Sequence, residues 1–341
     1  MFDALYPFLR AGLFRLNPET AHHVSMTGLR IAEKSAVLGL FSAAAGLESP
    51  VVVMGLKFPN RVGLAAGLDK EGDTIDALGR LGFGCVEIGT ITPVAQAGNP
   101  QPRLFRLIAH EAIINRMGFN NPGIDAGVAN VRQSTTFRGV IGFNIGKNKH
   151  TPNENAADDY LACLRKAYPV AGYIAVNLSS PNTPGLRELQ GAEASARLLG
   201  SLKQEQQKLA AEHGKHVPLL FKVAPDLDEA QIRDLSKVFL AGGLDGLIAT
   251  NTTLDRAAVA DHPRAGEAGG LSGRPVFEKS TEVLRAFSRH LGGRIPIIGV
   301  GGISSVEDAR EKIRAGASLV QIYTSFIYQG PALVRELARA L

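Results

Sequence analysis

Short apolar runs rich in β-branched residues alternate with amphipathic helical stretches along most of the chain. Eight such runs span residues 61–66, 85–90, 140–145, 172–178, 218–224, 246–251, 296–300 and 318–324. Strands that alternate with helices predict parallel pairing through right-handed crossovers. Eight units over roughly 280 residues favour a closed, eight-stranded parallel β/α (TIM) barrel over an open sheet, so the fold class is α/β.

The spacing of the strands is uneven, because long stretches follow the second and the sixth. These stretches predict elaborated loops. In the first of them, residues 103–108 and 111–116 alternate apolar and polar around Ala109 and His110, which predicts a hairpin laid over one end of the barrel. Residues 51–58 predict a second hairpin, which closes the opposite, N-terminal mouth.

Residues 1–45 differ in character from the predicted barrel domain, 46–341. The first segment is crowded with the apolar residues Tyr6, Phe8, Leu9, Leu13, Phe14 and Leu16. Asn17, Pro18 and Glu19 then supply an N-cap, a proline at the first helical position and an acid in the first turn. A second helix is expected to about Leu40, followed by a small-residue linker over 42–50. Periodicity alone favours packing of these amphipathic helices on the barrel wall over insertion in a membrane interface.

Composition and charge narrow the class of protein. Of 341 residues, 45% are hydrophobic and 20% charged, which allows one large globular domain with an appendage. The net charge of +5 is spread along the chain without a run of like charges, so a nucleic-acid-binding tail is not expected. A mild positive balance suits an anionic small substrate or an anionic lipid surface, although many enzymes carry such a charge without a functional role.

The two cysteines, Cys85 and Cys163, lie far apart, without a C-x-x-C motif or a histidine-rich cluster. This pattern argues against a disulfide scaffold, a structural zinc or an iron–sulfur site, and no metal is expected. Both cysteines lie in apolar runs and are predicted to be small buried hydrophobes. The sequence shows neither a signal peptide nor a stretch of 18 uncharged apolar residues that could span a bilayer.

Polar or glycine residues end all eight predicted strands, and active sites of such barrels lie at the carboxyl ends of the strands. The strand ends are Ala65, Ala66, Gly67, Leu68, Asp69 and Lys70, then Thr90, Asn144, Asn177, Lys222, Thr250, Asn251 and Thr252, and finally Gly301, Gly302, Tyr323 and Thr324. A single terminal Asn or Thr is more often a turn former. Eight such ends together indicate a site. Its amides, hydroxyls and two lysines suit the binding of a polar, planar, anionic cofactor better than hydrolysis.

The last two strands carry the candidate phosphate site. Gly301 and Gly302 precede Ser304, Ser305 and an acidic helix start at 306–308, which predicts exposed backbone N–H groups at a helix N-terminus. Thr324 adds a hydroxyl beside them. A tight turn that needs glycine for positive φ is the alternative. The glycine-rich segment 269–273 can supply further donors or can be a flexible loop.

Four segments resemble the signature segments of dihydroorotate dehydrogenases. They are Ala66-Gly67-Leu68-Asp69-Lys70, Asn115-Arg116-Met117-Gly118-Phe119, Asn177-Leu178-Ser179-Ser180-Pro181-Asn182-Thr183 and Val300-Gly301-Gly302-Ile303. Each is moderately specific alone, and their order and spacing also fit the family. The resemblance covers essentially the whole chain.

The resemblance implies which residues bind each ligand. FMN would be held by Ala66, Gly67, Leu68, Asp69, Lys70, Thr90, Asn144, Asn177, Lys222, Thr250, Gly273, Gly302, Tyr323 and Thr324. Dihydroorotate would contact Lys70, Asn115, Arg116, Met117, Gly118, Phe119, Asn177, Asn182, Asn251 and Thr252. Orotate is a planar amide ring bearing a carboxylate, so asparagine amides can pair with its donors and acceptors, and Lys70 would neutralise its charge.

Ser180 is the base that the resemblance implies, removing a proton from C5 while a hydride leaves C6 for the flavin. A serine hydroxyl is a weak base and needs a hydrogen-bonded relay in a dry pocket. Without the resemblance, Ser180 is a turn residue before Pro181. Lys222, if near flavin N1, would stabilise the negative charge of the reduced ring.

Ser180 and the extension 1–45 both point to the quinone-reducing class, since soluble relatives generally have cysteine at this position and lack the helices. In that class the two helices form a hydrophobic entry for the quinone on the membrane. The resemblance therefore favours contact of the helices with a membrane, whereas periodicity alone favoured packing on the barrel wall. His22, Arg106 and Tyr323 match positions near the quinone head. The resemblance implies a peripheral protein on the cytoplasmic face of a bacterial inner membrane, working in pyrimidine biosynthesis without a partner protein.

Three alternatives remain open at this level. One is another FMN barrel reductase, such as a tRNA dihydrouridine synthase, which would require a basic RNA-binding extension that the sequence does not show. A second is a flavin-free lyase or isomerase of a phosphorylated sugar, with Lys70 or Lys222 as a Schiff-base residue. The third is a membrane-surface binding module with the barrel as its scaffold.

Overall fold

Eight parallel strands close into a barrel in a computed structural model that describes residues 2–34 and 47–341. In chain order the barrel strands are β3 (Val62–Leu64), β4 (Cys85–Ile91), β7 (Val140–Ile145), β8 (Tyr173–Asn177), β9 (Leu219–Val223), β10 (Gly246–Ala249), β12 (Ile297–Val300) and β13 (Ala317–Ile322). Each strand pairs with its neighbour in this sequence, and β13 pairs with β3 to close the ring. The predicted TIM barrel and its eight strands are confirmed.

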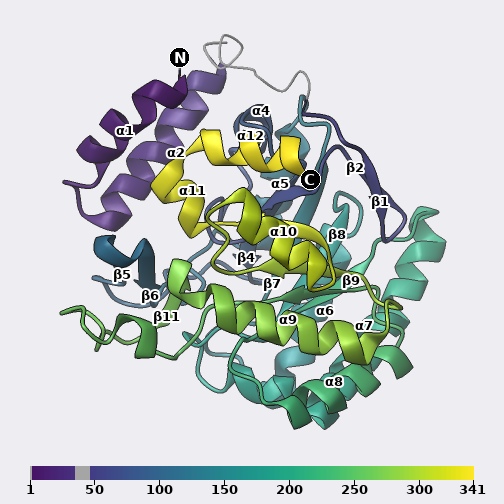
Figure 1. Ribbon diagram of the computed structural model, residues 1–341. Helices are drawn as coiled ribbons and strands as arrows, with labels where there is room; N and C mark the ends of the chain where they lie inside the picture. The colour runs from purple at the N-terminus through teal and green to yellow at the C-terminus, as the bar shows by residue number, and fades with distance from the viewer. Residues whose placement is uncertain (1, 35–46) are drawn as a thin grey trace.

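Helices connect successive strands, two more follow the last strand, and together they surround the barrel (Figure 1). They are α4 (Ile75–Arg80), α5 (Ile124–Gln133), α6 (Ala156–Ala167), α7 (Ala192–His213), α8 (Glu229–Ala241), α9 (Phe277–Leu291), α10 (Val306–Arg314), α11 (Thr324–Gln329) and α12 (Pro331–Ala340). Their apolar faces pack on the strands in one continuous cluster of buried side chains. This packing provides the parallel sheet with the cover on its outer face that such sheets require.

A second apolar cluster fills the inside of the barrel. It contains Ala65, Cys85, Tyr173, Leu220, Ile248, Ile298 and Leu319, one from nearly every strand or strand end. Cys85 and Cys163 are both buried, and burial raises the pKa of the Cys85 thiol to about 12 and that of Cys163 still further. The prediction that both cysteines are buried hydrophobes is therefore confirmed.

The hairpin of β1 (Val51–Val53) and β2 (Leu56–Phe58) covers the N-terminal end of the barrel, as predicted. Val53 and Phe58 pack into the inner cluster. The sulfur of Met54, in the turn, lies against Gly246 at the start of β10, where an added Cβ would come within 2.6 Å of it. The opposite, C-terminal end stays available for a site.

A three-stranded antiparallel sheet stands at that opposite end. Its strands β5 (Leu104–Leu107) and β6 (Ala112–Asn115) form the predicted hairpin around a single 3-10 turn at Ile108–His110. The third strand, β11 (Gly270–Gly273), pairs with β6 and comes from the glycine-rich segment that the sequence left open between donors and a flexible loop. That segment is therefore ordered by pairing with a strand far away in the sequence.

The N-terminal helices α1 (Phe2–Leu13) and α2 (Pro18–Lys34) lie beside α11 and the three-stranded sheet (Figure 1). The side chain of Asn17 accepts a hydrogen bond from the backbone N–H of Glu19, which confirms the predicted start of α2. The expected continuation to Leu40, most of the linker and the domain boundary at 45/46 lie outside the described residues. No described helix is long and apolar enough to cross a membrane.

Two sets of polar contacts hold these helices on the barrel. The Tyr6 hydroxyl and the Arg10 guanidinium donate to the carbonyl oxygens of Ile327 and Tyr328, both in α11, each at 2.7 Å. On α2, Glu19 forms a buried ion pair with Arg103 just before β5, at 2.6 Å. The extension is thus attached beside the C-terminal end of the barrel, where the predicted site lies.

Candidate active site

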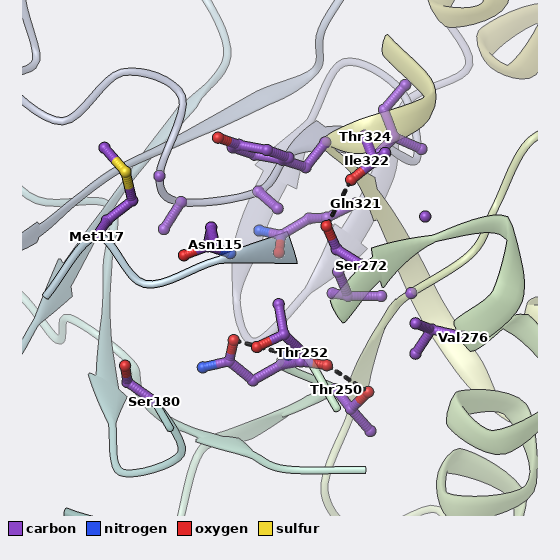
Figure 2. Close-up of a pocket in the computed structure, with 18 of the residues that line it drawn as sticks. Asn115, Met117, Ser180, Thr250, Thr252, Ser272, Val276, Gln321, Ile322 and Thr324 are labelled. Carbon is purple, nitrogen blue, oxygen red and sulfur yellow. Dashed lines mark hydrogen bonds between the residues drawn. The ribbon is translucent and has the colours of Figure 1, made fainter. Parts of the chain in front are cut away.

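A pocket opens at the carboxyl ends of the barrel strands, and most of the predicted site residues lie in its wall. From the predicted set the wall contains Ala66, Gly67, Lys70, Thr90, Asn115, Met117, Gly118, Phe119, Asn177, Ser180, Asn182, Lys222, Thr250, Asn251, Thr252, Gly273, Gly302, Tyr323 and Thr324. Figure 2 shows Ser180 on one side of this pocket and Thr324 with Val276 on the other. Folding therefore gathers residues from seven strand ends and from the β6 loop into one wall.

Two predicted residues from the β3 loop do not lie in the wall. Leu68 is buried in the outer apolar cluster. The carboxylate of Asp69 is also buried, and it accepts hydrogen bonds from the backbone N–H groups of Gly72, at 2.7 Å, and Thr74, at 3.1 Å. The Asp69 side chain therefore holds the shape of the loop that presents Gly67 and Lys70.

Two further predicted residues lie behind the wall. The Arg116 guanidinium pairs with Glu267 at 2.7 Å and stacks over the ring of Phe105, 4.5 Å from its centre. Asn144 is fully buried and accepts a hydrogen bond from the Thr90 hydroxyl, which does line the pocket. Direct ligand contacts of Arg116 and Asn144 stay predictions.

Lys70 is the cation of the β3 loop. Its Nζ donates to the carbonyl oxygen of Gly67 at 2.6 Å. Burial of the ammonium group lowers the pKa of Lys70 to about 8, and the nearby carboxylate of Glu19 opposes that shift. Lys70 is therefore mostly charged at neutral pH, and it can pair with a carboxylate that enters the pocket.

Ser180 lies in the loop after β8 and is buried. Its Oγ accepts a hydrogen bond from the backbone N–H of Asn182 at 3.2 Å. The Asn182 amide donates to the carbonyl oxygen of Asn115 at 3.1 Å, which ties this loop to the end of β6. Among the described residues, no carboxylate or imidazole is hydrogen-bonded to Ser180, so the relay that a serine base needs is not built from such a side chain.

Arg187 joins the Ser180 loop to the loop after β10. Its Nε donates to the carbonyl oxygen of Ser179 and its Nη2 to that of Thr252, each at 3.0 Å. Its Nη1 pairs with Asp226 at 2.9 Å. Two walls of the pocket are thereby fixed relative to each other by one guanidinium group.

Amide side chains form a connected row across the pocket floor. The Asn177 amide donates to Thr90 Oγ1 at 3.0 Å and accepts from the Asn251 amide at 3.2 Å. Asn251 also donates to the Ser179 hydroxyl at 3.0 Å. These contacts orient the amides before any ligand arrives, so their remaining donors and acceptors face the pocket in a fixed pattern.

Beneath this floor lies a buried carboxylate that the sequence analysis did not select. Glu87, in the middle of β4, accepts hydrogen bonds from Asn144 and Tyr173 at 2.8 Å and from Gln321 at 2.9 Å. Lys222 Nζ lies 3.5 Å from it. Burial next to Glu87 raises the pKa of Tyr173 well above its ordinary value. The sequence could have indicated Glu87, because a charged residue inside an apolar strand is rarely buried without partners.

The end of the pocket near β11 and β13 carries small residues and hydroxyls. Gly273 and Gly302 have φ values of 100° and 75°, which favour glycine, and both line the pocket. The hydroxyls of Ser272 and Thr324 lie 2.8 Å apart, and Figure 2 marks this hydrogen bond. Backbone and hydroxyl donors in this arrangement suit a phosphate group.

Two backbone N–H groups of the predicted phosphate site are engaged within the protein. Asp308 accepts from the backbone N–H of Ser304 at 2.8 Å. The hydroxyl of Ser305 accepts in turn from the backbone N–H of Asp308 at 3.1 Å. Asp308 and Ser305 therefore support the turn before α10, while Gly301, Gly302, Ser304, Tyr323 and Thr324 line the pocket. Phosphate binding at this end stays a prediction.

The pocket wall fits FMN in its chemistry. A hydroxyl-rich and glycine-rich end suits the phosphate, and the row of amides suits the polar edge of the ring. The Oε1 of Gln321, which lies in the wall, is buried and has no hydrogen-bond partner among the described residues. An N–H group of a ligand can satisfy this acceptor.

The predicted quinone residues do not all lie in this pocket. Tyr323 lies in the wall, where its ring is 3.3 Å from the position of a Cβ at Gly67. Arg106 donates to the carbonyl oxygens of Leu13 and Leu16, so it holds the α1–α2 connection. His22, on α2, is near Lys70, and burial followed by the Lys70 charge lowers the pKa of His22 to about 2. His22 is therefore neutral.

A β/α barrel with an amide-, hydroxyl- and lysine-lined pocket at its C-terminal end defines a class of cofactor-binding barrel enzymes. The family profile described as dihydroorotate dehydrogenase matches residues 49–341. The chain belongs to this family, which confirms the prediction from the signature segments.

Several dihydroorotate dehydrogenases are similar to this chain over nearly its whole length. A dihydroorotate dehydrogenase (quinone) of Akkermansia muciniphila is 63% identical over 341 residues, covering 100% of this chain and 98% of that protein. A protein of the same name from Neisseria meningitidis is 57% identical over 337 residues, covering 99% of each. The crystal structure of the Eimeria tenella dihydroorotate dehydrogenase in complex with ferulenol matches with a TM-score of 0.85 at 37% identity, over 97% of this chain and 93% of that one. The predicted quinone-dependent class is confirmed by these relatives.

Proposed function

We propose that this pocket oxidises dihydroorotate to orotate, with FMN as the hydride acceptor and a membrane quinone as the final electron acceptor. One observation carries the proposal. Amides, hydroxyls and two lysines from seven strand ends form one pocket in a chain that is 63% identical to a dihydroorotate dehydrogenase (quinone). The pocket contains the donors that a flavin and a carboxylate-bearing amide ring require.

FMN would occupy the side of the pocket that β12, β13 and β11 form. The phosphate would bind at Gly273, Gly302 and Thr324, where backbone and hydroxyl donors gather. The polar edge of the ring would lie toward Lys222 and the amide row of the floor. There the ammonium of Lys222 stabilises negative charge that develops on the ring.

Dihydroorotate would occupy the side formed by the β3 loop, the end of β6 and the Ser180 loop. Lys70 supplies the cation for its carboxylate. Asn115, Asn182 and Asn251 lie in the wall and supply amide donors and acceptors for the ring. Each of these amides is already oriented by a hydrogen bond to a neighbouring loop, so binding orders few side chains.

Ser180 would take the proton from C5 of the substrate at its Oγ. Bound FMN supplies the acceptor for the hydride that leaves C6. The buried position of Ser180 keeps bulk water from competing for the proton, and the N–H group of Asn182 fixes the direction of the Oγ lone pairs. The contact between Ser180 and Asn182 therefore positions the base.

The N-terminal extension would provide the route for the quinone and the contact with the membrane. Several large apolar side chains on α1 and α2 are exposed, including Phe8 at 77% and Ile31 at 63%. The same helices are held on α11, which follows Tyr323 in the chain, and beside β5. We place the protein on the cytoplasmic face of the cell membrane, as a peripheral protein.

The visible spectrum of the purified protein tests this function. A yellow protein whose flavin absorbance bleaches when dihydroorotate is added, and returns when a quinone analogue follows, is the expected result. A colourless protein would favour a flavin-free lyase or isomerase. A yellow protein that dihydroorotate does not bleach would favour another FMN barrel reductase.

A further inference from the structure

A buried lysine without an ion pair lies behind the glycine loop of the pocket. Lys312, on α10, is 0% exposed, and its Nζ donates to the hydroxyl of Ser280 on α9 at 2.6 Å. Its Nζ also lies 5.1 Å from the centre of the Phe277 ring. Among the described residues, no carboxylate lies within ion-pair distance of this ammonium group. A buried charge without a partner is costly, so its retention calls for a physical reason.

The nearby charged groups do not neutralise Lys312. Asp308, on the same helix, is engaged by the backbone N–H and the hydroxyl of Ser304. Glu311 points to the surface, where it pairs with Arg285 and Arg314. Burial acts most strongly against the charge of Lys312, Asp308 and Glu311 favour that charge from a distance, and Arg285 opposes it. No carboxylate among the described residues therefore forms an ion pair with Lys312.

The contacts of Lys312 lead directly to the loop that faces the pocket. The hydroxyl of Ser280 lies 3.0 Å from the carbonyl oxygen of Gly301. A Cβ at Gly302 would come within 2.4 Å of the Phe277 backbone, so this glycine rests on the first turn of α9. A 15-residue helix carries positive partial charge at that end. A lysine beside it is unfavourable unless an anion binds nearby.

We propose that Lys312 is a positioning residue for phosphate binding, which supports the Gly301–Gly302 loop through Ser280 and supplies from behind it the charge that an anionic phosphate compensates. The proposal rests on the proposed function, because the phosphate is that of FMN. Lys312 acts through the loop and lies outside the pocket wall. Its effect is therefore specific to the phosphate end of the ligand and leaves the ring end unchanged.

Exchange of bound FMN against added riboflavin tests this role in the holoenzyme. The two ligands share the ring and differ only in the phosphate, so a general loss of stability or of ring binding cancels in the ratio of their affinities. Lys312→Met keeps an unbranched side chain of nearly the same length and removes its charge. It is expected to lower the FMN-to-riboflavin ratio by roughly tenfold or more, as for the loss of one charge-assisted interaction.

Two controls separate charge from packing. Lys312→Arg keeps the charge and is expected to retain most of the FMN preference. Lys147 is another buried lysine, whose Nζ donates to the carbonyl oxygen of Thr151 at 2.7 Å, outside the pocket wall. Lys147→Met is expected to leave the ratio unchanged. An equal loss of FMN and riboflavin binding in Lys312→Met would overturn the proposal.

The pH dependence of the parent protein gives a second measurement, which needs no variant. Burial lowers the pKa of Lys312 to about 7 in the absence of ligand. The lysine is charged below its pKa and neutral above it, while a phosphate group stays fully ionised above its second pKa of about 6. The FMN preference is therefore expected to fall as pH rises above 7, and a flat profile counts against Lys312. A parent protein that holds no flavin would overturn the proposed function together with this inference.

Discussion

The buried ion pair between Glu19 and Arg103 offers the sharpest test of how the N-terminal extension is attached. The carboxylate and guanidinium side chains are only 7% and 9% exposed, and Arg103 reaches Glu19 through Nε as well as Nη2. Arg103 also donates to the carbonyl oxygens of Ala97 and Asn99. Glu19→Ala would leave the guanidinium buried with these two neutral acceptors alone.

The expected cost follows from that arrangement. Removing one partner of a buried pair destabilises by about 3–5 kcal/mol, because the other charge stays buried. Glu19 belongs to α2 and lies outside the barrel, so the loss applies to the docking of α2. The barrel can lose this contact and keep its core, which is built from the two large apolar clusters. Opening of α2 should therefore become several hundred-fold more frequent, at roughly 1.4 kcal/mol for each factor of ten.

Amide hydrogen exchange of the α2 backbone measures this opening directly. Faster exchange in α2 with unchanged protection in the barrel strands is expected, together with a loss of turnover with quinone and retained turnover with a soluble dye. Glu193→Ala removes an exposed pair with Arg197 and serves as the matched control, which should change neither property. Unchanged exchange of α2 in Glu19→Ala would refute the reasoning.

The same pair predicts a dependence on acid. Although burial opposes it, the Arg103 hydrogen bonds lower the pKa of Glu19 below its ordinary value. A lowered pKa in the folded state means that the carboxylate stabilises docking above its unfolded pKa. This contribution is lost as pH falls through the folded pKa. The protection of α2 amides, measured relative to their intrinsic exchange rate at each pH, should therefore fall as pH drops below the ordinary pKa of a glutamate. Glu19→Ala should lack this fall.

Further predictions follow from the site. Ser180→Ala should keep its flavin but slow reduction by dihydroorotate by roughly 100-fold or more, measured by stopped-flow absorbance, and unchanged kinetics would remove Ser180 from the mechanism. Deletion of residues 1–45 should spare flavin reduction by dihydroorotate while impairing quinone turnover and vesicle binding; normal quinone kinetics in the truncated enzyme would contradict the entry route. The Michaelis constant for dihydroorotate should rise as pH rises through about 8, because Lys70 loses its charge there, and Lys70→Met should show a high constant with no such rise.

Much of the fold could be predicted because it depends on local pattern. Each barrel strand is a run of apolar residues that are buried on both faces, and the length of such a run is visible in the sequence. The hairpin at β5 and β6 was visible because alternation persists on both sides of a short turn. Strand β11 was not visible, since its glycines carry no periodicity and their order comes from pairing with β6.

The candidate site was predictable to the extent that it lies at strand ends. Asn177, Lys222 and Thr250 end strands, and the closed barrel brings all strand ends to one rim. Glu87 and Lys312 were missed because each lies within a regular element, and only the packing of neighbouring strands or helices reveals its partners. The contacts of Asp308 with Ser304 were likewise not visible, because they depend on the conformation of the turn before α10.

The sequence alone therefore determined the eight barrel strands, the helices between them, the rim on which the chemistry lies, and the family. These properties depend on the spacing and the type of residues along the chain, which are known without a structure. The tertiary structure decided which polar groups face the pocket, which support it from behind, and how the N-terminal helices reach it. Such properties depend on distances between residues hundreds of positions apart. Closure of the barrel sets the contact between Glu87 and Gln321, and docking of α1 on α11 sets that between Tyr6 and Ile327.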